Sequence, residues 1–196
     1  MKNLLKVGIA STLLLGLTPA VADAKTPVKS STKTVAPYYK WNGYTGYSHK
    51  FVLDKDFKRA LLNSNVTVNG MKVTKSVTAK QADPALMALA KYNEHKKFNS
   101  KLLTKKYDTL GLKAGKEYFV IQMPVQKGKV SLAQIKKLYG KYEIEEGQLK
   151  DSKTKKFYTE SYVIRTKSGS AEFHFDKNEK LNKVYILSTT TITFGY

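Results

Sequence analysis

The fold is decided by the stretch Val130-Ser-Leu-Ala-Gln-Ile-Lys-Lys-Leu-Tyr-Gly140. Ser131 and Gln134 have the spacing of a capping box, in which each side chain accepts a hydrogen bond from a backbone N–H at the start of a helix. Val130 and Ile135 occupy the two positions of a hydrophobic staple across that start. Glycine often follows the last residue of a helix. The stretch therefore predicts a capped amphipathic helix from Ser131 to the tyrosine before Gly140.

Three strand-like runs follow this helix, near residues 157–165, 170–176 and 183–194. Within the middle run, apolar and polar residues alternate from Ala171 to Asp176, which is the pattern of a strand that buries one face. Helices packed on antiparallel strands define the α+β class. We therefore predict an α+β fold of short helices on an antiparallel β-sheet, with a C-terminal helix followed by a three-strand meander.

A short helix and a hairpin are expected earlier in the chain. Asp54 is a suitable N-cap for a helix that ends near Leu62. The run Phe51-Val52-Leu53 before it has the residues of a buried strand end. Asn69-Gly70, between two runs rich in valine, is a strong hairpin signal.

A second helix is predicted to open at Asp83-Pro84, since aspartate is a common N-cap and proline suits the first helical position. Its apolar stripe is expected to consist of Leu86, Leu89 and Ala90. After it, Tyr118–Ile121 is expected to form a strand that ends before Pro124.

The N-terminal residues have the pattern of a secretory signal. Lys2 and Lys6 precede an apolar run over 7–17, and Ala22-Asp23-Ala24 is a small-x-small cleavage site. The alternative, a membrane anchor, needs about 20 apolar residues, and this run is shorter. We expect a signal peptide over 1–24, a flexible basic tail over 25–36 and a single α+β domain over 37–196, without a membrane span. The protein is expected to be secreted and partly associated with the cell surface.

Positive charge dominates the composition. The chain has 35 Lys and Arg against 15 Asp and Glu, a net charge of +20. Loss of Lys2, Lys6 and Asp23 with the signal leaves 33 against 14, a net charge of +19. Such a field attracts polyanions, which outside a cell include DNA, RNA and teichoic acids. The alternative is that the lysines only keep an exported protein soluble.

Only two of the basic residues, Arg59 and Arg165, are arginine. Reading of base sequence relies on the flat, bidentate guanidinium group, whereas a lysine ammonium is a point charge suited to phosphate. The composition therefore favours binding of a nucleic acid backbone without regard to sequence.

The candidate nucleic-acid-binding residues form two lysine groups and an aromatic pair. They are Lys96, Lys97, Lys101, Lys105 and Lys106, then Lys150, Lys153, Lys155 and Lys156, and finally Tyr39 and Trp41. The pair belongs to the aromatic segment 38–47, in which rings next to lysines could stack on unpaired bases. Alternatively, these aromatic residues form part of the core.

No catalytic or metal site is predicted, and neither is a cofactor. The histidines His49, His95 and His174 are far apart in sequence, and the chain has no cysteine for a structural zinc site. The tight acidic group Glu143, Glu145 and Glu146 is expected on a surface loop. We therefore expect the protein not to be an enzyme.

Several segments resemble the immunodominant staphylococcal antigen B family. They are Pro37-Tyr38-Tyr39, Asn42-Gly43-Tyr44, Phe51–Phe57, Val68–Lys72 and Ser131–Lys141. Residues 80–106 are longer than the family pattern. The resemblance implies a secreted, surface-associated antigen that binds extracellular nucleic acid without strong sequence preference and has roles in host interaction and virulence. It transfers no catalytic residue.

Two functions remain open at this point. The first is a non-enzymatic, sequence-independent binder of extracellular DNA or RNA that uses a lysine-rich surface. The second is a secreted protein-binding module, an adhesin or enzyme inhibitor with host proteins as partners, which its charge holds at the anionic cell wall.

Overall fold

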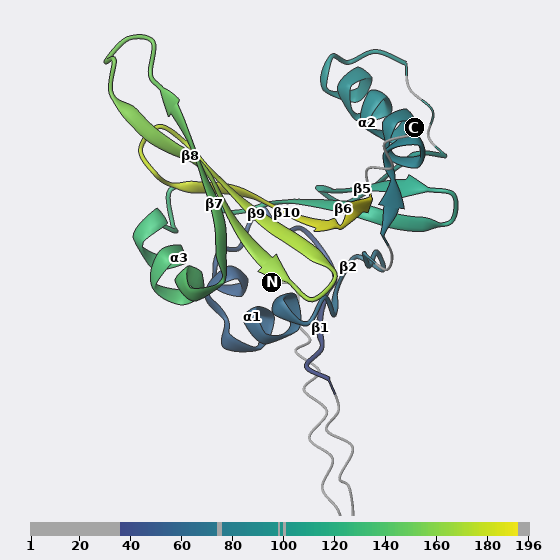
Figure 1. Ribbon diagram of the computed structural model, residues 1–196, viewed down its shortest axis with the longest axis horizontal. Coiled ribbons are helices and arrows are strands. Elements are labelled where there is room, and N and C mark those ends of the chain that lie inside the picture. The colour runs from purple at the N-terminus through teal and green to yellow at the C-terminus, as the bar shows by residue number, and fades with distance from the viewer. Residues whose placement is uncertain (1–35, 74–75, 98, 100, 192–196) are drawn as a thin grey trace, which may run out of the picture. The chain divides into compact units, whose positions relative to one another are not determined.

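The main element of the fold is an antiparallel sheet of seven strands, in the order β4-β5-β6-β10-β9-β8-β7 (Figure 1). This computed structural model describes residues 36–73, 76–97, 99 and 101–191. The predicted signal peptide, and the predicted basic tail up to residue 35, lie outside the described residues. The strands are β4 (Leu103–Lys106), β5 (Thr109–Ala114), β6 (Glu117–Pro124), β7 (Glu143–Lys150), β8 (Phe157–Thr166), β9 (Gly169–Phe175) and β10 (Leu181–Ser188).

Two small parallel pairs and the helices complete the described part. β1 (Tyr39–Trp41) pairs with β2 (Val66–Val68), and β3 (Val77–Thr78) pairs with β11 (Thr190–Thr191). The helices are α1 (Lys55–Leu62), α2 (Ala79–Asn93) and α3 (Leu132–Tyr139), with 3-10 turns η1 (Lys50–Leu53) and η2 (Gly140–Tyr142). The predicted α+β class is confirmed, and so is the order of helix and then strands in the C-terminal half.

The centre of the sheet is buried on both faces. Successive residues of a strand point to opposite faces, and in β6 Ile121 joins one buried cluster while Val120 joins another. The larger cluster includes side chains of α1, α3, β1 and β2. The smaller cluster includes Ala82 and Ala85 of α2. The helices therefore cover the sheet from two sides (Figure 1).

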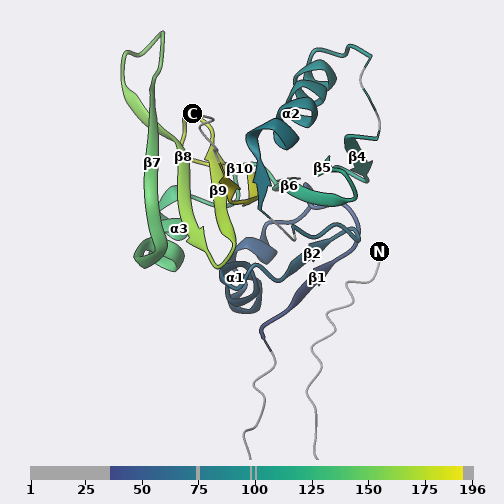
Figure 2. The same cartoon turned by 45° about the vertical axis from the view of Figure 1, so that its right-hand side comes forward.

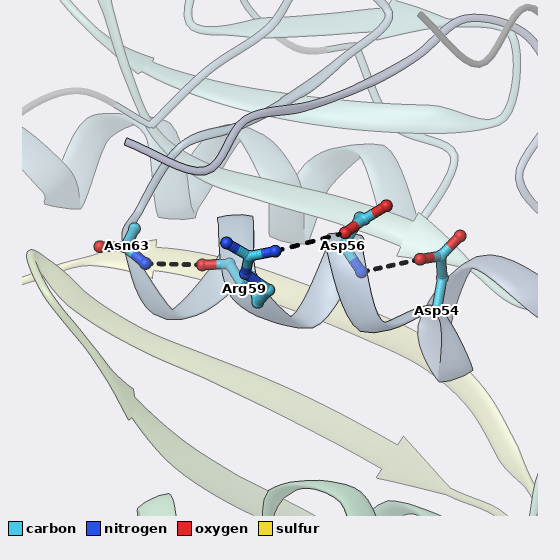
Figure 3. Close-up of polar contacts among 4 residues, drawn as sticks. All are labelled: Asp54, Asp56, Arg59 and Asn63. Atoms are coloured by element: carbon cyan, nitrogen blue, oxygen red, sulfur yellow. Dashed lines mark hydrogen bonds and ion pairs between the residues drawn. The ribbon is translucent and has the colours of Figure 1, made fainter. Parts of the chain in front are cut away.

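The helix α1 begins at the predicted cap. The Asp54 side chain accepts a hydrogen bond from Asp56 N at 2.8 Å. Within the helix, Arg59 lies 3.9 Å from the Asp56 carboxylate, and Asn63 Nδ2 donates to Arg59 O at 2.8 Å (Figure 3). The cap and the end at Leu62 confirm the helix predicted from this stretch.

The helix α3 also confirms its prediction. Ser131 Oγ accepts from Gln134 N at 3.3 Å, and Gln134 Oε1 accepts from Ser131 N at 2.8 Å. Val130 and Ile135, the two staple residues, are fully buried. The α-helix stops before Gly140, but this glycine keeps a right-handed φ of −50° and continues into η2. Its freedom to adopt left-handed backbone is therefore not used.

The start of α2 differs from the prediction. The helix begins after Thr78, whose side chain accepts from Gln81 N, and Gln81 Oε1 accepts from Thr78 N in return. This capping box satisfies two backbone donors at the start of the helix. The cap predicted at Asp83 therefore does not form, and the helix starts earlier. Pro84 consequently lies inside the helix. The buried stripe also differs: it consists of Ala82, Ala85 and Ala88, whereas Leu86 and Ala90 are exposed and Leu89 is half-buried.

Further segments correct or extend the predictions. Residues 51–53 form 3-10 backbone instead of a strand end, although Phe51 and Val52 are buried. The expected acidic loop at 143–146 lies on β7. This edge strand is exposed over most of its length, so its sequence has no apolar alternation. The strand predicted at 118–121 extends through Pro124.

The remaining differences concern turns and strand ends. The turn at Asn69-Gly70 is confirmed, with left-handed φ values of 54° and 79°. However, the chain after it pairs only through isolated bridges at Met71 and Val73. The last predicted strand ends at Ser188, and Thr190–Thr191 pair separately with β3.

The capping box of α3 gives a stability prediction. Ser131→Ala removes the acceptor for Gln134 N and is expected to lower the free energy of unfolding by about 1 kcal/mol in urea denaturation. Ser131→Asp, which keeps an acceptor at the cap, is the matched control and should retain the parent stability. An alanine variant as stable as the parent would contradict the role of the cap.

Candidate functional site

The two lysine groups lie at opposite edges of the seven-stranded sheet (Figure 2). The group that we call the β4 lysines consists of Lys105 and Lys106 on edge strand β4, Lys101 just before it, and Lys96 and Lys97 in the segment between α2 and β4. The β7 lysines, at the end of edge strand β7 and in the loop to β8, are Lys150, Lys153, Lys155 and Lys156. Six strand spacings of about 4.8 Å place the edges roughly 29 Å apart. The structure therefore does not bring the two groups into one patch.

All nine of these lysines are exposed. Three of them lie close to other charged or aromatic groups. Lys96 Nζ is 2.7 Å from Glu94 Oε2, Lys105 Nζ is 5.9 Å from the centre of the Tyr92 ring, and Lys150 Nζ is 5.6 Å from the centre of the Phe157 ring. Asp151 lies among the β7 lysines and accepts hydrogen bonds from Thr154 N and Lys153 N. The bonds from Thr154 are the main cause of a lowered pKa for this carboxyl group. Each group thus has one neighbouring carboxylate, Glu94 or Asp151, and the β4 lysines have the larger excess of positive charge because they number five against four.

Tyr39 and Trp41 lie against the core. Tyr39 is only 9% exposed, and its ring makes an edge contact with Phe57 at 5.2 Å between ring centres. Burial is the main cause that raises the pKa of its hydroxyl to about 12. Trp41 is half-buried, and its ring centre lies 5.3 Å from that of Phe51. Tyr39 is therefore withdrawn from the solvent, whereas Trp41 keeps part of its surface exposed, because β1 packs against β2 and α1.

Three other tyrosines form an exposed group, which we call the tyrosine cluster: Tyr44, Tyr47 and Tyr107. Their exposed fractions are 49%, 81% and 54%. The ring centre of Tyr44 lies 5.5 Å from that of Tyr47 and 5.1 Å from that of Tyr107. Two members belong to the aromatic segment singled out by the sequence. Tyr107 lies in the turn between β4 and β5, which had no aromatic pattern to mark it.

Two polar side chains fix the loop that holds Tyr44 and Tyr47. Asp108 accepts hydrogen bonds from Thr45 N at 3.0 Å and from Gly46 N at 2.7 Å. Asn69 accepts from Gly43 N at 2.7 Å, and its Nδ2 donates to Gly43 O at 3.1 Å. The same Nδ2 lies 3.0 Å from Thr109 Oγ1, next to the β4–β5 turn. The loop is therefore tied to that turn at two points.

Two of the histidines and the glutamates of β7 make separate contacts in the described part of the chain. His49 Nδ1 contacts Gln126 Oε1 at 2.8 Å, and His174 Nε2 contacts Glu172 Oε2 at 3.0 Å. On β7, Glu143 accepts from the Tyr162 hydroxyl, and Glu146 pairs with Lys136. Among the described residues, no three His, Asp or Glu side chains are grouped as metal ligands. None of the described helices has the length and hydropathy to cross a bilayer.

Comparison with known proteins gives one family. A sequence model described as Immunodominant staphylococcal antigen B matches residues 38–186. Immunodominant staphylococcal antigen B of Staphylococcus aureus strains USA300, COL and MW2 is 32% identical to this chain over 157 residues. The alignment covers 78% of this chain and 78% of each relative. No solved structure is significantly similar.

The bonds to Asp108 predict how the loop responds to its loss. In Asp108→Ala, the amides of Thr45 and Gly46 lose their acceptor, so they should exchange with deuterium at least about 10-fold faster. The change is measured by NMR-detected hydrogen exchange. Amides in the paired strands β6 and β10 serve as the internal control and should keep their rates. Unchanged exchange at both loop amides would show that Asp108 does not hold the loop.

Proposed function

This chain belongs to the immunodominant staphylococcal antigen B family, and we propose that it is a secreted, non-enzymatic protein that binds extracellular nucleic acid without sequence preference. The observation that carries the proposal is the exposure of nine lysines at the two edges of the sheet, in a chain with a net charge of +20. Lysine ammonium groups neutralise phosphates and release counterions, which drives binding that is independent of sequence.

The two arginines support backbone contact over reading of bases. Arg59 lies on α1, 3.9 Å from Asp56 of the same helix, and Arg165 lies on β8. Bidentate reading of guanine takes a single guanidinium group, and only two of the 35 basic residues carry one. The ligand is therefore recognised by its phosphates. Other polyanions such as teichoic acid offer similar phosphates, and binding to the cell wall through them would hold part of the protein at the cell surface.

One observation favours the second candidate, a protein-binding module such as an adhesin or enzyme inhibitor. The edge strand β7 has exposed apolar side chains at Ile144 and Leu149, and Phe157 at the start of β8 is 67% exposed. An edge strand offers unpaired backbone groups to an extended peptide. The positive charge would then serve to hold the protein at the anionic wall.

Salt dependence tests the lysine surface. Replacement of the five β4 lysines by Gln should reduce the slope of log affinity against log salt by about 0.9 for each phosphate of duplex DNA that is no longer neutralised. The affinity for every DNA sequence should fall by the same factor, as measured by fluorescence anisotropy with labelled duplexes. Replacement of the four β7 lysines by Gln should have a smaller effect, because it removes four positive charges instead of five.

Arginine at the same five positions is the matched control, since it keeps the charge and should keep the slope. Affinity that stays constant from low to high salt would overturn the proposal. So would a protein that ignores nucleic acid but binds a specific protein partner, in which case the edge-strand candidate takes its place.

The absence of catalysis is a separate prediction. We expect DNA incubated with the purified protein and magnesium, calcium or zinc to stay intact on a gel over hours. A boiled sample provides the control for contaminating nucleases that resist heat. Time-dependent degradation that copurifies with the protein and stops when a chelator is added would contradict this expectation.

A further inference from the structure

We propose that the tyrosine cluster is a stacking platform for unpaired bases, so that the protein prefers single-stranded over duplex nucleic acid. This inference rests on the proposed function, because it assigns a second contact to the same ligand. The second contact differs from the first in its chemistry: the lysines contact phosphate, whereas the tyrosines would contact the faces of bases. Aromatic rings beside basic residues are the usual components of single-strand binding surfaces.

The exposure of the cluster is the first support. Tyr44, Tyr47 and Tyr107 come from two segments that are far apart in the sequence, yet their rings are in contact while about half or more of each side chain faces solvent. Aromatic surface of this kind is costly to leave in water, and grouped exposure marks an interaction surface more often than single exposed residues do.

The backbone of Tyr107 is the second support. Its φ of 55° is left-handed, a conformation that favours glycine and that bulky residues rarely adopt. Glycine would be the unstrained residue in this two-residue turn between β4 and β5. A tyrosine at this position therefore lowers the stability of the fold. Strained backbone of this kind is often found at binding sites.

The rigidity of the support is the third argument. Asp108 and Asn69 hold residues 43–46 against the β4–β5 turn through the hydrogen bonds described above. Gly46 lies so close to this support that a Cβ there would be 3.0 Å from Asp108 Oδ2. A platform that is already ordered loses little conformational entropy when a ligand binds.

Charge identifies the occupant. Tyr107 follows Lys105 and Lys106 of the β4 lysines directly in the chain. The Lys106 ammonium group lies beside the Asn69-Gly70 turn, 3.4 Å from the point where a Cβ of Gly70 would be. Lys105 Nζ lies instead 5.9 Å from the centre of the Tyr92 ring on α2. Because Asn69 also binds Gly43 in the loop of Tyr44, an anionic polymer that reaches the Lys106 ammonium group lies next to the segments that carry the cluster. In duplex DNA the faces of the bases are occupied by their neighbours, so only unpaired bases can use the rings.

The experiment compares three ligands with the same number of phosphates: a thymidine oligomer, an abasic single strand and a duplex. The parent protein should bind the thymidine oligomer more tightly than the abasic strand. Tyr107→Gly and Tyr44→Leu should each lower the affinity for the thymidine oligomer about 10-fold. The affinities for the abasic strand and the duplex should stay unchanged. Tyr44→Phe, which keeps the ring, should bind like the parent.

Controls separate stacking from folding. Tyr107→Gly suits the left-handed backbone and should be at least as stable as the parent in thermal denaturation. Tyr38→Leu changes a tyrosine that is similarly exposed, at 51%, but lies outside the cluster, and should not alter binding. Equal affinity for the thymidine and abasic strands, or tyrosine variants that bind like the parent, would overturn the platform and leave the lysine surface standing. Failure to bind any of the three ligands would overturn the proposed function as well.

Discussion

The pairing of β6 with β10 is the constraint on which the rest of the structure depends. These central strands bury apolar side chains on both faces, as Val120 and Ile121 of β6 show. Removal of both faces from water requires a layer on each side of the sheet. α1 and α3, with β1 and β2, supply one layer, and α2 supplies the other. The outermost strands β4 and β7 form the edges of the sheet and face the solvent. The two lysine groups lie on or near these edges.

Elements with local signals were predicted well from the sequence. Asp54 caps α1, and Ser131 with Gln134 caps α3, because a cap needs only residues within one helical turn. The start of α2 was mistaken where two local signals compete, Thr78 with Gln81 against Asp83-Pro84. The strands β4, β5 and β7 were missed because edge position or close packing removes the alternation of apolar and polar residues. Their pairing depends on partners elsewhere in the sheet.

The candidate site was predictable only in part. The charge and the two lysine groups can be read from composition and spacing. The tyrosine cluster cannot, because the bond from Gly46 N to Asp108 joins positions 62 residues apart. The aromatic segment 38–47 shows that buried and exposed aromatic residues are difficult to tell apart from sequence. Tyr39 faces the core, the next residue Lys40 is exposed, and Tyr44 lies on the loop beyond the strand. The direction of each side chain on the strand and the anchoring of the loop determine which of these residues are buried. Neither can be predicted from the residue types.

The separation of the two edges has a consequence for valency. A short oligomer that contacts β4 does not extend across roughly 29 Å of sheet to β7. A long flexible polymer can contact both edges of one molecule, or two polymers can contact one edge each. In the first case the second contact is intramolecular and benefits from a high effective concentration. In the second case the molecule is a crosslink. Under the proposed function, two separated cationic edges would allow a single folded chain to hold strands of a polymer together.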